Sequence, residues 1–116
     1  MKCNIMLKLS NWNDIIGMCR ANKYQANSHK QQEMKDISWF IRSIPPIKKY
    51  PVEIEFKWHI KNTRSDLDNK SVKSILDAMQ NLGILENDNI KHINKITHIA
   101  IPDKTEYIEM EIKESE

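Results

Sequence analysis

Apolar and polar residues alternate along three stretches of the chain, as in strands that bury one face of a sheet. The cleanest stretch is 52–61, where Val, Ile, Phe and Trp alternate with Glu, Lys and His. Residues 3–9 and 107–112 show the same alternation. Residues 93–101 are rich in Ile without a clean period, and we expect a further strand there.

A long helix is predicted after the first strand. Asn11 or Asn13 can cap it, and Asp14 would lie in its first turn, where the helix dipole favours a carboxylate. No Gly or Pro interrupts residues 18–44, and Pro45-Pro46 ends the segment. Apolar residues at helical spacing form a stripe for the core. These are Met34, Ile37, Phe40 or Ile41, and Ile44.

A second helix is predicted from Asp68 to Gly83, because glycine suits the position just after a helix end. Its apolar stripe consists of Val72, Ile75, Leu76, Met79 and Leu82. Together the segments predict an α+β fold. We expect a single domain over residues 1–116, with a mixed sheet of about four strands and two main helices in the order β-α-β-α-β-β.

Charge is divided unevenly between the two halves of the chain. Residues 1–50 carry nine Lys and Arg against three acids, whereas residues 51–116 carry nine against thirteen. The basic half suits a polyanion such as nucleic acid, and the acidic half suits a cation; the alternative is a solvated surface with uneven charge. The middle of the first helix, about residues 20–32, is nearly all polar, so it is either solvated or faces a ligand.

The remaining composition predicts a soluble protein of the cytoplasm. Cys3 and Cys19 do not form a C-x-x-C pair, and their apolar neighbours indicate buried, reduced thiols. No apolar run approaches the roughly 18 residues of a membrane-spanning helix. We therefore expect no membrane partner.

Three carboxylates could meet at the ends of these elements. Asp66 and Asp68 follow the predicted strand 52–61, and residues two apart in an extended segment point to the same side. Asp88 follows the second helix, and we expect the turn at 86–89 to return it to the first two. Mg²⁺ binds such oxygen ligands, and without a cation three carboxylates would repel one another. The plainer alternatives are that Asp68 only caps the helix and that 86–89 is an ordinary polar loop.

Other side chains near this cluster are less informative. Lys73 and Asp77 form an i,i+4 pair, usually a surface feature worth about 0.2–0.5 kcal/mol, although Lys73 is within reach of anything bound at Asp68. The strand histidines share no metal-ligand spacing, and we expect them to be solvated. They are His59, His92 and His98.

One stretch of the chain resembles a known family. Asp-Leu-Asp-Asn at 66–69, Lys73, Ile-Leu-Asp-Ala-Met at 75–79, Gly83 and Glu-Asn-Asp at 86–88 together resemble the RusA family of Holliday-junction resolvases, which is common in phages and prophages. The resemblance is strong over about residues 64–92 and looser over the rest. It implies a Mg²⁺-dependent crossover junction endodeoxyribonuclease, with Mn²⁺ as a substitute metal. Such an enzyme nicks two strands of four-way junction DNA symmetrically, as a homodimer, in recombination and repair.

The resemblance also assigns roles to residues. Asp66, Asp68 and Asp88 would be the catalytic, metal-binding carboxylates, and Lys73 the catalytic lysine. The chain departs from the family pattern at two places. Lys73 lies one position late when counted from the Asp-Leu-Asp-Asn motif, so Lys70 is an alternative. Asn87 replaces one acid of an Asp-Asp pair, for which Glu86 could compensate.

Contacts to the DNA backbone are expected from the basic part of the first helix. The predicted residues are Arg20, Lys23, His29 and Lys30. A bacterial host cell would be the setting, with a phage or prophage origin. The main alternative is a catalytically weak or inactive protein that binds junction or duplex DNA, and a third is a regulatory domain without a nucleic-acid role.

Overall fold

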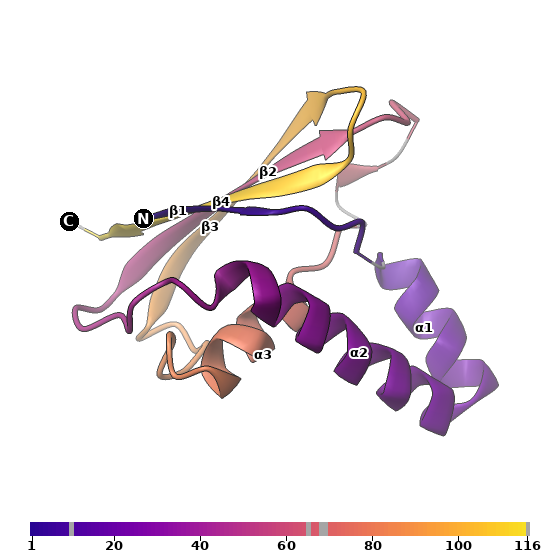
Figure 1. Cartoon of the computed structure of the whole chain (residues 1–116), viewed down its shortest axis with the longest axis horizontal. Coiled ribbons are helices and arrows are strands. Elements are labelled where there is room, and N and C mark those ends of the chain that lie inside the picture. The colour runs from indigo at the N-terminus through magenta and orange to yellow at the C-terminus, as the bar shows by residue number, and fades with distance from the viewer. Residues whose placement is uncertain (10, 65, 68–69, 116) are drawn as a thin grey trace.

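A computed structural model describes residues 1–9, 11–64, 66, 67 and 70–115. Over these residues the chain folds into one four-stranded sheet and three helices (Figure 1). In chain order these are β1 (Lys2–Ile5), α1 (Trp12–Ala21), α2 (Lys23–Ile41), β2 (Val52–Ile60), α3 (Lys73–Asn81), β3 (Ile93–Pro102) and β4 (Tyr107–Glu114). The predicted α+β class with a mixed sheet is confirmed.

The strand order in the sheet is β1-β4-β2-β3. β4 pairs antiparallel with both β1 and β2, whereas β3 runs parallel to β2. A parallel neighbour needs a crossover connection, and α3 lies within the crossover between β2 and β3. The amino end is joined to β4, since the Met1 amino group donates to the Ile112 carbonyl at 2.8 Å.

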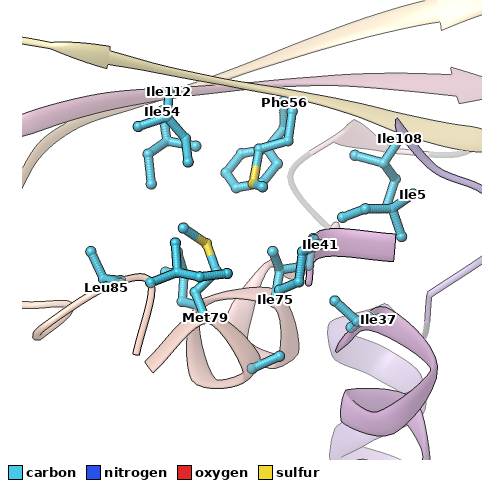
Figure 2. Packing of buried hydrophobic residues seen from close by; sticks show 14 of the residues in the cluster. Ile5, Ile37, Ile41, Ile54, Phe56, Ile75, Met79, Leu85, Ile108 and Ile112 are labelled. Atoms are coloured by element: carbon cyan, nitrogen blue, oxygen red, sulfur yellow. The ribbon is translucent and has the colours of Figure 1, made fainter. Parts of the chain in front are cut away.

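The helices cover one face of this sheet (Figure 1). The alternating apolar residues of β2, from Val52 to Ile60, all point to that face and are at most 8% exposed. Figure 2 shows Ile54, Phe56 and Ile112 of the sheet pointing toward Met79 and other helical side chains. The strand alternation therefore identified the core face correctly. In the described chain, no helix is both long and apolar enough to cross a membrane.

The predicted first helix is divided in two at Asn22, and this is the main departure from the expected element order. Asn22 is extended, with φ −163° and ψ 113°, and its side-chain oxygen accepts hydrogen bonds from the backbone N–H groups of Tyr24 (2.9 Å) and Gln25 (3.2 Å). Asparagine favours such caps because its side chain replaces the missing helical partner. α1 itself begins after Asn11, one of the two predicted caps.

Other boundaries also differ from the predicted ones. α3 begins at Lys73, with Val72 at its N-cap, so the prediction of a helix from Asp68 placed the start too early. Before it, Lys70 N–H donates to the Leu67 carbonyl at 3.1 Å. Leu82, predicted to be buried, is 43% exposed because the helix has already ended there. β1 ends at Ile5, whereas alternation predicted a strand to residue 9.

The two thiols are free but are not buried as predicted. Cys3 is half-buried and its thiol donates to the Phe40 carbonyl at 3.1 Å; burial raises the pKa of this thiol. Cys19 is exposed on α1, which packs mainly against α2 and receives little cover from the rest of the chain. The apolar neighbours of Cys19 were therefore a poor guide to its burial.

Gly83 ends α3 in the left-handed region, with φ 74°. Gly83 N–H donates to the Gln80 carbonyl (3.1 Å) and Ile84 N–H to the Met79 carbonyl (2.9 Å), the bond pattern of a Schellman motif. This turn reverses the chain and brings Ile84 and Leu85, both nearly fully buried, back onto the core.

Gly83→Ala should destabilise the fold by about 1 kcal/mol, because a Cβ disfavours the left-handed conformation. Gly17→Ala is the matched control: it lies inside α1, where alanine should be neutral or stabilising by up to about 1 kcal/mol. At either position an added Cβ would meet no atom within 4 Å. The two substitutions therefore differ in the backbone conformation that alanine must adopt and not in steric contacts. Urea unfolding of both variants measures the effect, and equal stabilities would contradict it.

His98 lies on the helix-covered side of the sheet and is not solvated as predicted. The Trp58 indole N–H donates to His98 Nδ1 at 2.9 Å, so that nitrogen must carry no proton. The ring also stacks on Phe56, with centroids 5.7 Å apart. Burial lowers the pKa of His98 below its usual range.

Acid should therefore weaken the fold through His98. As pH falls below about 6.5, the unfolded chain binds a proton that the folded imidazole resists, and stability is lost down to the lowered folded pKa. His98→Gln supplies an acceptor that does not titrate. We expect the free energy of unfolding of the native protein to fall relative to that of H98Q between pH 7.5 and 5.5. Parallel profiles in urea titrations would contradict this.

Candidate functional site

The structure brings together two of the four residues predicted to be catalytic, Lys73 and Asp88. Lys73 is the first residue of α3, and its ammonium lies 3.7 Å from Asp88 Oδ2 and 3.5 Å from Asp77 Oδ1. The turn at Gly83 makes this possible, because it sends the chain back past α3. The predicted return of Asp88 to Asp66 and Asp68 is a different contact, and it stays a prediction.

α2 joins the same cluster. Lys30 Nζ lies 2.7 Å from Asp77 Oδ2, and one helical turn further on Glu33 Oε2 accepts a hydrogen bond from Ser74 Oγ at 3.0 Å. Asp77 is therefore held between two lysines from different helices. The contacts of Glu33 and Ser74 were not expected from the sequence, since they depend on how α2 crosses α3.

The motif at 66–69 is described only in part. Asp66 is exposed, and the adjacent Leu67 is half-buried and packs against the core. Asp68 and Asn69 lie outside the described residues. Within the described residues, no group of three or more His, Cys, Asp or Glu side chains could hold a metal ion. The prediction of a three-carboxylate metal site therefore depends on Asp68 and stays a prediction.

The two alternative site residues have other surroundings. Lys70 is half-buried and lines a small cavity with Leu9 and Trp58. Glu86 is an exposed side chain whose carboxylate lies 3.8 Å from His92 Nε2. Lys73 therefore lies beside Asp88, Lys70 lines a different cavity, and Glu86 lies beside a histidine; which lysine serves the motif stays a prediction.

The residues predicted to bind DNA fall on α1 and α2. Arg20 is exposed in the last turn of α1. The other three line one cavity together with Lys73: these are Lys23, His29 and Lys30. Part of the polar middle of the predicted first helix therefore lines a hollow next to Lys73, together with residues of α1 and α3.

His59 has a role that the sequence did not indicate. It was predicted to be solvated, but it is 8% exposed, with Nδ1 2.9 Å from Asp103 Oδ2 and Nε2 2.7 Å from Glu109 Oε1. Its ring stacks on Tyr107, its cross-strand neighbour, at 3.9 Å between centroids. The hydrogen bond from His59, followed by those from the Thr105 and Lys104 amides, lowers the pKa of Asp103. These contacts fasten the β3–β4 turn to β2.

A scan against models of known protein families gives no match, and a search of curated proteins finds no significantly similar sequence.

Proposed function

We propose that this protein is a Mg²⁺-dependent endonuclease that resolves four-way DNA junctions. The observation that carries the proposal is the position of Lys73, whose ammonium lies between two carboxylates where basic helix α2 meets α3. Lys73 is 52% exposed, and exposed ion pairs usually stabilise a fold by only about 0–1 kcal/mol. These ion pairs therefore contribute little to fold stability. An ammonium group beside a carboxylate that binds a metal ion instead suits phosphodiester cleavage.

The donor chemistry of the site fits a hard cation. Asp66 and Asp88 would supply carboxylate oxygens, the ligand class that Mg²⁺ takes together with several waters. Asp66 is exposed and the Asp88 side chain is 32% exposed, so both are open to solvent. Asp66, Asp68 and Asp88 would hold the ion, which when bound would supply Lewis-acid charge and a source of hydroxide at neutral pH.

The chain's own residues have defined tasks in this proposal. The Lys73 ammonium neutralises charge that develops on the scissile phosphate in the transition state. Asp77 holds that ammonium in place from one turn further along α3, at 3.5 Å. Lys30, Lys23, His29 and Arg20 bind the flanking backbone phosphates, which makes affinity fall steeply with salt.

Paired symmetric nicks need two sites related by a twofold axis, so we propose a homodimer. The proposed setting is the cytoplasm of a bacterial cell, where recombination produces four-way junctions.

The test uses a synthetic four-way junction and a linear duplex of the same sequence, each with Mg²⁺ or with EDTA. We expect symmetric nicks in two strands of the junction with Mg²⁺ only, and Mn²⁺ should substitute. Asp68→Asn should abolish them, and undiminished cleavage by that variant would remove Asp68 from the site.

The same assay separates the alternative functions. Junction binding without metal-dependent nicking would contradict the nuclease and favour a DNA-binding protein. Absence of affinity for any DNA would contradict both and favour a regulatory domain.

A further inference from the structure

A cavity of about 350 Å³ opens between α1, α2 and the first turn of α3. Its size lies within the usual range of small-ligand sites, about 300–1,000 Å³. Apolar side chains of α1 and α2 make up much of its wall, namely Ile15, Met18, Cys19 and Ala26. The cavity can therefore take an uncharged, flat or apolar group.

Three lysines surround this wall. Lys23 and Lys30 come from α2 and Lys73 from α3; Glu33 is the carboxylate among the lining residues, and Asp77, outside the lining, pairs with Lys30 and Lys73. Asn27 and Ser74 add side chains that can form hydrogen bonds. A fitting ligand would thus combine an apolar body that has polar edges with an adjacent anion.

Lys30 and Lys73 belong both to this lining and to the charged cluster at Asp77. A phosphate held at Lys73 would therefore place the group attached to it at the mouth of the cavity. In a DNA strand that group is a sugar and its base. A base reaches such a cavity only when it leaves the helical stack, which costs least where pairing is already interrupted, as at a junction crossover.

We infer that this cavity receives one unstacked nucleobase of the DNA strand whose phosphate lies at Lys73. This inference rests on the proposed function and deepens it: the protein recognises a nucleotide with an unstacked base. Apolar contacts to the base face give affinity with little sequence preference, and the lysines bind the phosphate.

Cys19 provides a direct probe, because its thiol is exposed and lines the cavity. Cys3 is the internal control, because it lies outside the cavity lining. Its thiol is half-buried and donates a hydrogen bond to the Phe40 carbonyl, and burial raises the pKa of that thiol. Iodoacetamide alkylates the thiols in a buffer with EDTA, and mass spectrometry measures the rate at each cysteine. Three reactions are compared: without DNA, with the intact junction, and with a junction whose crossover nucleotides lack their bases.

We expect the intact junction to slow alkylation of Cys19 by about tenfold at saturation, because occupancy above roughly 90% covers the thiol. The abasic junction should bind but leave Cys19 as reactive as in free protein, and Cys3 should not change. Equal protection by both junctions would overturn the inference. Protection of Cys19 that rises with protein concentration in the absence of DNA would overturn it in favour of a second copy of the chain.

A pair of variants gives an independent readout. Ala26→Phe fills the cavity, whereas Gln25→Phe places the same ring at an exposed position of α2 that does not line it. We expect A26F to weaken binding of the intact junction about tenfold, or about 1.4 kcal/mol, and to bind the abasic junction as the native protein does. Q25F should bind both normally. Native binding of the intact junction by a folded A26F would overturn the base site.

Cleavage of the intact junction by the native protein with Mg²⁺ separates the two proposals. If cleavage occurs and Cys19 is not protected selectively, only the base site fails. If the junction is neither bound nor cut, both fail.

Discussion

Replacing Lys73 with alanine should slow Mg²⁺-dependent junction cleavage by about 100-fold or more, the usual cost of removing one group that stabilises transition-state charge. Its ammonium lies 3.7 Å from Asp88, beside the proposed metal site. Junction affinity should fall far less, because Arg20, Lys23, His29 and Lys30 remain to bind phosphates. Single-turnover rates and gel-shift titrations on the same junction measure the two effects.

Lys70→Ala is the matched control for this variant. Lys70 is the alternative lysine of the motif, but it lines a different cavity, near Leu9 and Trp58. K70A should therefore cleave at close to the native rate. A large loss in K70A combined with native activity in K73A would reverse the assignment of the lysine.

Phe56→Ala should have the largest effect on stability, about 3–5 kcal/mol, the typical cost of removing a buried aromatic ring and leaving a cavity. Phe56 is 0% exposed at the centre of β2 and packs between Met110 of β4 and His98 of β3. Because whole domains are stable by only about 5–15 kcal/mol, this variant should be close to unfolding at 37 °C. Urea unfolding at 25 °C measures the difference.

Ile90→Ala is the control for the loss of an apolar side chain without a cavity. Ile90 is 87% exposed, so its removal should change stability by less than about 0.5 kcal/mol. A cost below about 1 kcal/mol for F56A would mean that the inner face of β2 is not the core of the fold.

The sheet and its buried face could be predicted from the sequence because a strand's alternation has a period of two and does not depend on its neighbours. The stripe at Met34, Ile37 and Ile41 was equally local, and all three are buried. The break at Asn22 was not predicted, since an asparagine among polar residues gives no sign whether its side chain caps a new helix or faces solvent. The start of α3 was misplaced because residue type favours Asp68 as a helix N-cap and disfavours Val72, although Val72 occupies the N-cap of α3.

The candidate site was predictable to the extent that it lies within one stretch of chain. Lys73 and Asp88 lie on either side of the Gly83 turn, and the sequence placed both near the motif, although their contact with each other was not itself predicted. The contacts of Lys30 with Asp77 and of Glu33 with Ser74 depend on the packing of α2 against α3, which no local pattern specifies. The same holds for His59, whose carboxylate partners come from β4 and the turn before it.

If Asp88 and Lys73 belong to a metal-dependent nuclease site, two isosteric variants of neighbouring carboxylates should differ in cleavage. Asp88 and Asp77 both contact Lys73, at 3.7 and 3.5 Å, but only Asp88 is proposed as a metal ligand. With Mg²⁺ and a four-way junction, Asp88→Asn should cut at least about 100-fold more slowly than the native protein, whereas Asp77→Asn should stay within about tenfold of it. Undiminished cleavage by D88N would exclude Asp88 from the metal site.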